Sequence, residues 1–139
     1  MIMIRSDATT ESGALPPPEV FEAMGKFNQE LIDAGVFVAG EGLQPSSRGA
    51  RVHFSHGNVR VIDGPFTEAK ELIAGFWIWQ VKSRDEAIDW LRRSPFVNAP
   101  DVTIEVRQVG ELEDFGDAVP QDVIEGEKRQ RAQAAAQQA

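Results

Sequence analysis

The sequence of 139 residues predicts an α+β fold, in which strands and helices alternate along the chain. Two segments carry apolar residues at helical spacing, and several others are short, apolar or β-branched, and bounded by turn residues. A His-Gly pair at 56–57 separates two short β-branched runs, which is typical of a tight hairpin. These three observations set the order of the elements.

The first third of the chain predicts a strand, a helix and a second strand. Residues 1–5 form a strand whose two faces are both apolar, which indicates burial on two sides, and 6–15 is a polar loop. Apolar residues recur at i, i+4, i+7 and i+11 in a helix expected over 18–34. Gly35 closes this helix as a left-handed cap, and a second strand follows over 36–43.

Residues 50–109 predict a hairpin, a long strand, a second helix and a last strand. The hairpin strands are expected over 50–55 and 58–62, and a third long strand over 73–82. A helix over 84–93 then leads to a last strand over 102–109. With the hairpin as an insertion, the order is that of a ferredoxin-like split βαβ sheet, which has both helices on one face.

The strand over 73–82 predicts an assembly. Phe76 and Ile78 alternate with Trp77 and Trp79, so both faces of this strand are apolar. Since the helices cover only one face, the other face would be exposed in a monomer. We therefore expect a homodimer through the apolar sheet face, with the two sheets forming a dimeric α+β barrel. The alternative is that the C-terminal segment folds back over this face.

Composition and charge bound the function classes. The net charge is −8, with no basic cluster, so nucleic acid is not an expected partner. There is no cysteine and no long apolar run, and no leader-like segment precedes the first strand, so no membrane contact and a cytoplasmic location are expected. We expect one domain over 1–110 and an acidic extension over 111–139, which either docks as a partial helix or is disordered.

The turn Asp63-Gly64-Pro65-Phe66 is the sharpest candidate site. In a structural interpretation the Asp63 carboxylate accepts backbone N–H groups, the proline fixes φ, and Phe66 fills the core beneath. In a functional interpretation Asp63 lies at the mouth of the barrel and acts as a base or binds a polar ligand. Glu41 stands between two glycines at a strand end and can point into the same cavity. Because a buried acid without a partner is costly, Glu41 is expected to pair with a backbone group, an arginine or a ligand.

The ligand-binding candidates therefore combine two carboxylates with three aromatic side chains. They are Asp63, Glu41, Phe66, Trp77 and Trp79, although tryptophans in an acidic protein are more often core residues. No metal site is expected, because strand parity separates His53 from His56, which are the only histidines. No cofactor is expected either, since the Gly-Glu-Gly stretch at 40–42 lacks the helix and lysine of a phosphate loop.

The stretch Asp63-Gly-Pro-Phe-Thr-Glu-Ala-Lys-Glu71 resembles the signature DGPF(A/T)E(T/A)KE of one branch of the YCII-related family. Ala34-Gly35-Val36, the segment 39–45 and Gly75-Phe76-Trp77 resemble the same branch. This resemblance implies a ferredoxin-like fold in a dimeric α+β barrel. It also implies a helix histidine paired with an aspartate in the members thought to be catalytic, and here Met24 stands at that place.

Three functions remain open at this point. The leading interpretation is a dimeric small-molecule-binding or regulatory protein without assigned catalysis, because a thioether at Met24 is no general base. One alternative is a lyase-like or dehalogenase-like enzyme on a small aromatic or carbonyl compound, with Asp63 or Glu41 as the base. The other is an interaction partner of sigma-factor or transcription machinery, through the acidic extension and the charged residues of the signature.

Overall fold

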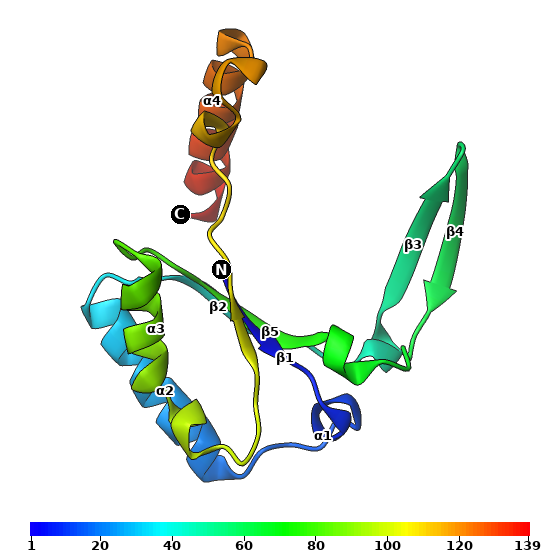
Figure 1. Cartoon of the computed structure of the whole chain (residues 1–139), viewed down its shortest axis with the longest axis vertical. Helices are drawn as coiled ribbons and strands as arrows, with labels where there is room; N and C mark the ends of the chain where they lie inside the picture. The colour runs from blue at the N-terminus through cyan, green and yellow to red at the C-terminus, as the bar shows by residue number, and fades with distance from the viewer. The chain divides into compact units, whose positions relative to one another are not determined.

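The computed structural model describes all residues from Met1 to Ala139, and the chain divides into two compact units, Met1–Gln108 and Val109–Ala139. The first unit is an α+β domain (Figure 1). Its strands are β1 (Ile2–Arg5), β2 (Phe37–Gly42), β3 (Ala50–Ser55), β4 (Asn58–Asp63), β5 (Ile73–Trp79) and β6 (Ile104–Val106). Its helices are α1 (Ala8–Glu11), α2 (Pro18–Asp33) and α3 (Arg84–Arg92), with 3-10 turns η1 (Ser46–Arg48), η2 (Ala69–Glu71) and η3 (Pro95–Asn98).

Four strands form one antiparallel sheet in the order β2-β5-β1-β6. The central strands β1 and β5 pair Ile2 with Trp77 and Met3 with Phe76. β6 pairs with the other edge of β1 and places Val106 opposite Ile2. The first and last strands of the unit are therefore direct neighbours.

The core lies between this sheet and the helices α2 and α3 (Figure 1). Trp77 and Trp79 of β5 are 5% and 8% exposed, and their rings lie 5.9 and 6.2 Å from the ring of Phe27 in α2. The indole N–H of Trp77 donates to the side-chain oxygen of Asn28 at 3.0 Å, which satisfies a donor in this core. The tryptophan side of β5 therefore faces the helices.

The opposite side of the sheet, called the open face here, presents the alternate residues of each strand. It carries Met3, Ala39, Glu41, Phe76, Ile78 and Glu105. The register places four of them in one row across the sheet, with half-buried Phe76 and Met3 in the middle and a glutamate at each edge. Arg5 forms an ion pair with Glu105 at 3.4 Å. The open face is thus an apolar strip with the unpaired Glu41 carboxylate at one edge and the Arg5–Glu105 ion pair at the other.

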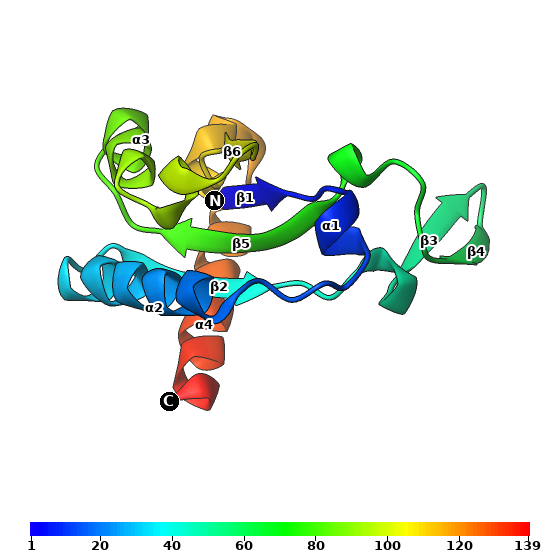
Figure 2. The same cartoon turned by 90° about the horizontal axis from the view of Figure 1, so that it is seen from below.

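The strands β3 and β4 form a separate two-stranded ribbon, called the arm here (Ala50–Asp63). The arm projects from the end of the sheet at which β2 ends and β5 begins (Figures 1 and 2). His56 and Gly57 have φ values of 49° and 83°, as a tight two-residue hairpin requires, so the predicted turn is confirmed. Every residue of both strands is exposed, and Arg51 of β3 contacts the ring of Phe66 at the base of the arm.

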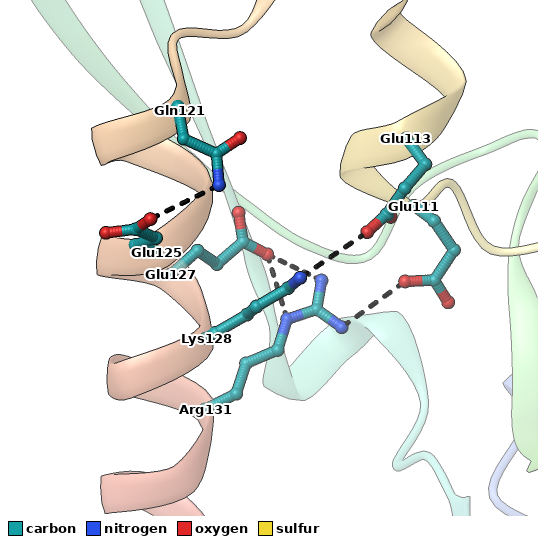
Figure 3. Close-up of polar contacts among 7 residues, drawn as sticks. All are labelled: Glu111, Glu113, Gln121, Glu125, Glu127, Lys128 and Arg131. Atoms are coloured by element: carbon teal, nitrogen blue, oxygen red, sulfur yellow. Dashed lines mark hydrogen bonds and ion pairs between the residues drawn. The ribbon is translucent and has the colours of Figure 1, made fainter.

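The second unit consists of a 3-10 segment η4 (Leu112–Ala118) and the helix α4 (Gln121–Gln138). Arg131 donates from Nε to Glu127 at 2.9 Å and lies 3.7 Å from Glu111, while Lys128 lies 3.9 Å from Glu113 (Figure 3). These pairs are exposed and individually weak. Of the two expectations for the tail, a partial helix or disorder, the helix is observed, over Gln121–Gln138.

Two local differences from the sequence-based expectation concern the ends of the sheet. The segment expected as a loop over 6–15 contains the one-turn helix α1, and the last strand, expected over 102–109, has only the three residues of β6.

No helix of the chain is both long enough and apolar enough to cross a membrane.

Candidate functional site

The signature turn is held by backbone contacts with the segment that precedes the arm. The N–H of Gly64 donates to the carbonyl of Gly49 at 3.0 Å, and the N–H of Gly49 donates to the carbonyl of Ser46 at 2.9 Å. The peptide bond between Gly64 and Pro65 is cis. A Cβ atom on Gly64 would lie 1.8 Å from the Ser46 carbonyl oxygen, so only glycine fits at this crossing.

A second set of contacts, called the Ser46 latch here, joins three segments that are distant in the sequence. The Ser46 hydroxyl donates to the Glu11 carboxylate and accepts the backbone N–H of Phe66 at 3.0 Å. The Ser46 N–H also donates to Glu11, at 3.1 Å. The latch thus ties α1, η1 and the signature turn together at the base of the arm.

The position of Glu11 depends on the short helix that carries it. Asp7 caps α1 by accepting the backbone N–H of Thr10 at 2.8 Å, and the Thr10 hydroxyl accepts the Asp7 N–H at 2.9 Å. The hydrogen bond from the Thr10 backbone lowers the pKa of Asp7 below its ordinary value. The cap therefore keeps its charged form at neutral pH, which favours the first turn of the helix.

Asp63 does not hold the turn as the structural interpretation expected. Its side chain is exposed and makes no hydrogen bond or ion pair, because Ser46 and Gly49 supply the contacts that fix the turn. Phe66 is half-buried, and it lies beneath the Arg51 guanidinium at 3.9 Å rather than in the hydrophobic core. The expected core position of Phe66 is therefore wrong.

The other candidates fall on two sides of one sheet. Glu41 is exposed on the open face, opposite Phe76, whereas Trp77 and Trp79 lie on the helix side. Asp63 belongs to the separate sheet of the arm. The structure thus brings Asp63 and Phe66 to the base of the arm and does not gather the five candidates around one cavity.

A cavity of about 280 Å³ lies where β1 ends and β6 is about to begin. Its lining residues are Arg5, Ser6, Asp7, Lys70, Asp101, Val102 and Thr103. Ser6 is 5% exposed and its backbone N–H donates to the Leu72 carbonyl, whereas its hydroxyl has no hydrogen-bond partner in the protein. Lys70 and Asp101 have no ion-pair partner either. The cavity thus offers one unpaired cation, one unpaired carboxylate and one free hydroxyl.

None of the residues that line this cavity was among the ligand-binding candidates predicted from the sequence. Lys70 was the one available signal, because it belongs to the charged end of the signature and also lines the cavity. Ser6 and Asp101 are 95 residues apart in the sequence, and the pairing of β1 with β6 brings them to the same cavity. The two histidines lie on the arm, with His53 opposite Arg60, and no group of three metal-ligating side chains is found.

Replacing Ser46 with alanine is expected to lower the free energy of unfolding by about 1–2 kcal/mol, because the Phe66 N–H and the Glu11 carboxylate each lose a partner. Urea unfolding of the full chain measures this change. Ser47→Ala is the control, since Ser47 is exposed and makes no side-chain hydrogen bond. Equal stabilities of the two variants would show that the latch does not stabilise the unit.

The first unit is therefore an α+β domain with a one-sided antiparallel sheet, a projecting β-arm and a small polar cavity at the end of the sheet. The family model of the YCII-related domain matches residues 2–113, and the chain belongs to this family, as the sequence predicted. Over 88 residues the chain is 32% identical to an uncharacterized protein of Rhizobium meliloti (strain 1021). That match covers 63% of this chain and 71% of the relative.

Proposed function

We propose that this chain is a small-molecule-binding or regulatory protein of the DGPF-signature branch of the YCII-related family, acting as a homodimer in the cytoplasm. The order β2-β5-β1-β6, with α2 and α3 on one side, supports a ferredoxin-like sheet. The apolar strip of the open face supports the pairing of two such sheets into a dimeric α+β barrel, since pairing would cover it.

The observation that carries the binding function is the polar cavity at Lys70. The Lys70 ammonium suits a carboxylate or phosphate group, Asp101 suits an amino group, and the Ser6 hydroxyl can serve either. The ligand class that matches all three is a small zwitterion or a small acid with a hydrogen-bond donor. The enzyme and transcription-partner alternatives stay hypotheses, since no contact in the site favours them.

The test is calorimetric titration of the full chain with a panel of small amino acids, hydroxy acids and their phosphates. A ligand held by Lys70 should bind roughly tenfold to a hundredfold more weakly to Lys70→Met, because a charge-assisted hydrogen bond is lost. Ser6→Ala should weaken it about tenfold, since the cavity would lose its free hydroxyl.

Lys82→Met is the matched control, because Lys82 is an exposed lysine outside the cavity. It should bind the same ligand as tightly as the unmodified chain. A ligand whose affinity is the same for all three variants does not use this cavity, and that result would contradict the proposed site. The absence of any binder in the panel at millimolar concentration would contradict the proposed ligand class.

A further inference from the structure

The ligand cavity and the Ser46 latch are joined by the same two segments of the chain. The first segment runs from Ser6 to Glu11 and contains α1, and the second runs from Phe66 to Leu72 and contains η2. At the cavity, the backbone N–H of Ser6 joins the segments by donating to the Leu72 carbonyl at 2.9 Å. At their other ends the Ser46 latch joins them, because it holds both Glu11 and the N–H of Phe66. The two segments therefore form a closed loop with the cavity at one junction and the latch at the other.

The second segment carries Lys70 between these two junctions. Residues 67–71 make no hydrogen bond or ion pair outside their own segment, because the backbone bonds of η2 are local. The Leu72 carbonyl is fixed by Ser6 on one side, and the Phe66 N–H is fixed by Ser46 on the other. The latch is therefore one of the two attachments that hold Lys70 in the wall of the cavity.

The first segment depends on the latch in the same way. The helix α1 has one turn and buries no residue, and a helix of this length is not stable by itself. The hydrogen bonds of Glu11 to Ser46 are the only side-chain hydrogen bonds of α1 that reach a distant segment. Asp7, which caps the other end of α1, lines the cavity. The helix α1 is therefore an element with a formed and an open state, and it contacts both the latch and the cavity.

We propose that ligand occupancy of the cavity and closure of the Ser46 latch are coupled, so that a bound ligand tightens the latch and an open latch weakens ligand binding. A ligand held by Lys70 together with Ser6 or Asp101 has all of its contacts only while both segments are in place. The two states therefore differ in affinity for the ligand, and this difference acts equally in both directions.

The coupling gives the cavity an output at the arm. Ser46 precedes β3 and Phe66 follows β4, so the latch joins the two strands of chain that enter and leave the arm. Both views show α1 at the end of the sheet nearest the arm (Figures 1 and 2). Ligand occupancy would thus set how firmly the arm is fixed to its unit. This inference rests on the proposed function and assigns a regulation to the same site.

The first measurement is amide hydrogen exchange of the full chain by NMR, with L-serine, glycolate and O-phosphoserine as probes. At a saturating concentration of the probe that binds most tightly, the Phe66 amide should exchange about fivefold to tenfold more slowly. The Arg60 amide, in the middle of the arm, is the internal control and should change less than about twofold. In Lys70→Met the probe should no longer slow the Phe66 amide. Equal slowing of both amides would indicate general stabilisation and would contradict the coupling.

The second measurement is calorimetric titration of the same probe into full-chain variants. Ser46→Ala should raise the dissociation constant about fivefold to tenfold, although Ser46 does not line the cavity. Ser47→Ala, which leaves the latch intact, should change it less than about twofold. Val36→Ala is the control for lost stability, because Val36 is a core residue that lies beside Gln80, at the opposite end of the sheet from Ser6. It should bind the probe as tightly as the unmodified chain.

The coupling and the proposed function fail in different ways. A probe that binds through Lys70 but neither slows the Phe66 amide selectively nor loses affinity in Ser46→Ala would leave the ligand site standing and overturn the coupling. An effect in only one of the two measurements would also overturn it, because linkage is reciprocal. If none of the probes binds the unmodified chain at millimolar concentration, the proposed ligand class is wrong and the coupling is wrong with it.

Discussion

The variant Phe27→Ala is expected to lose about 4 kcal/mol of unfolding free energy, the largest effect of any single substitution considered. Phe27 is 3% exposed, and its ring centroid lies 5.9 Å from Trp77, 6.2 Å from Trp79 and 6.3 Å from Trp90. Removing it leaves a cavity among three indoles that are themselves too large to close it. The tryptophan fluorescence of the folded state should change together with the urea midpoint.

Phe21→Ala on the same helix is the matched control for this prediction. Phe21 is 57% exposed, so the truncation removes the same atoms without opening a buried cavity, and a loss below about 0.5 kcal/mol is expected. A similar loss in both variants would mean that helix propensity, rather than the aromatic cluster, determines the stability of α2.

Replacing Gly64 with alanine is expected to cost about 3 kcal/mol, because the new Cβ atom would lie 1.8 Å from the carbonyl oxygen of Ser46 and 2.6 Å from its carbonyl carbon. Both are backbone atoms, so no side-chain rotation relieves the overlap. The Gly64–Gly49 hydrogen bond and the Ser46 latch would have to open. Urea unfolding reports the stability, and faster exchange of the Phe66 amide reports the opened latch.

Gly49→Ala is the control, at the other end of the same hydrogen bond. Its Cβ atom would lie 3.6 Å from the Ser46 oxygen, which is ordinary van der Waals contact, and its φ of −118° suits any residue. We expect a change within about 0.5 kcal/mol. If Gly64→Ala is equally mild, the crossing at Ser46 is not a fixed feature of the turn.

Local patterns were sufficient to predict much of the first unit. The apolar spacing and the cap predicted α2 to within one residue, and Gly35 does have the left-handed φ of 71° that ends it. Residue alternation also separated Phe76 from Trp77 correctly. The helix α1 was missed because one turn of four residues carries no period, and its only signal is the cap at Asp7.

The candidate site was less predictable, because its contacts join residues far apart in the sequence. Local turn chemistry made Asp63 the expected anchor of the signature turn, whereas the anchor is Ser46, which reaches 20 residues forward to Phe66 and 35 residues back to Glu11. Serine and glutamate are common in loops, and neither has a spacing pattern that indicates its partner. The cavity was hidden for the same reason.

The pairing of β1 with β5 and β6 has a consequence for how the chain acquires its structure during synthesis. β1 is made first, yet both of its neighbours, β5 and β6, come from the second half of the first unit. The sheet therefore cannot close until Val106 has left the ribosome, whereas α2 and the arm use contacts that are close in sequence and can form earlier. Until then one edge of β1 has no partner strand, and a nascent chain paused before β6 would be most vulnerable to misassociation at this edge.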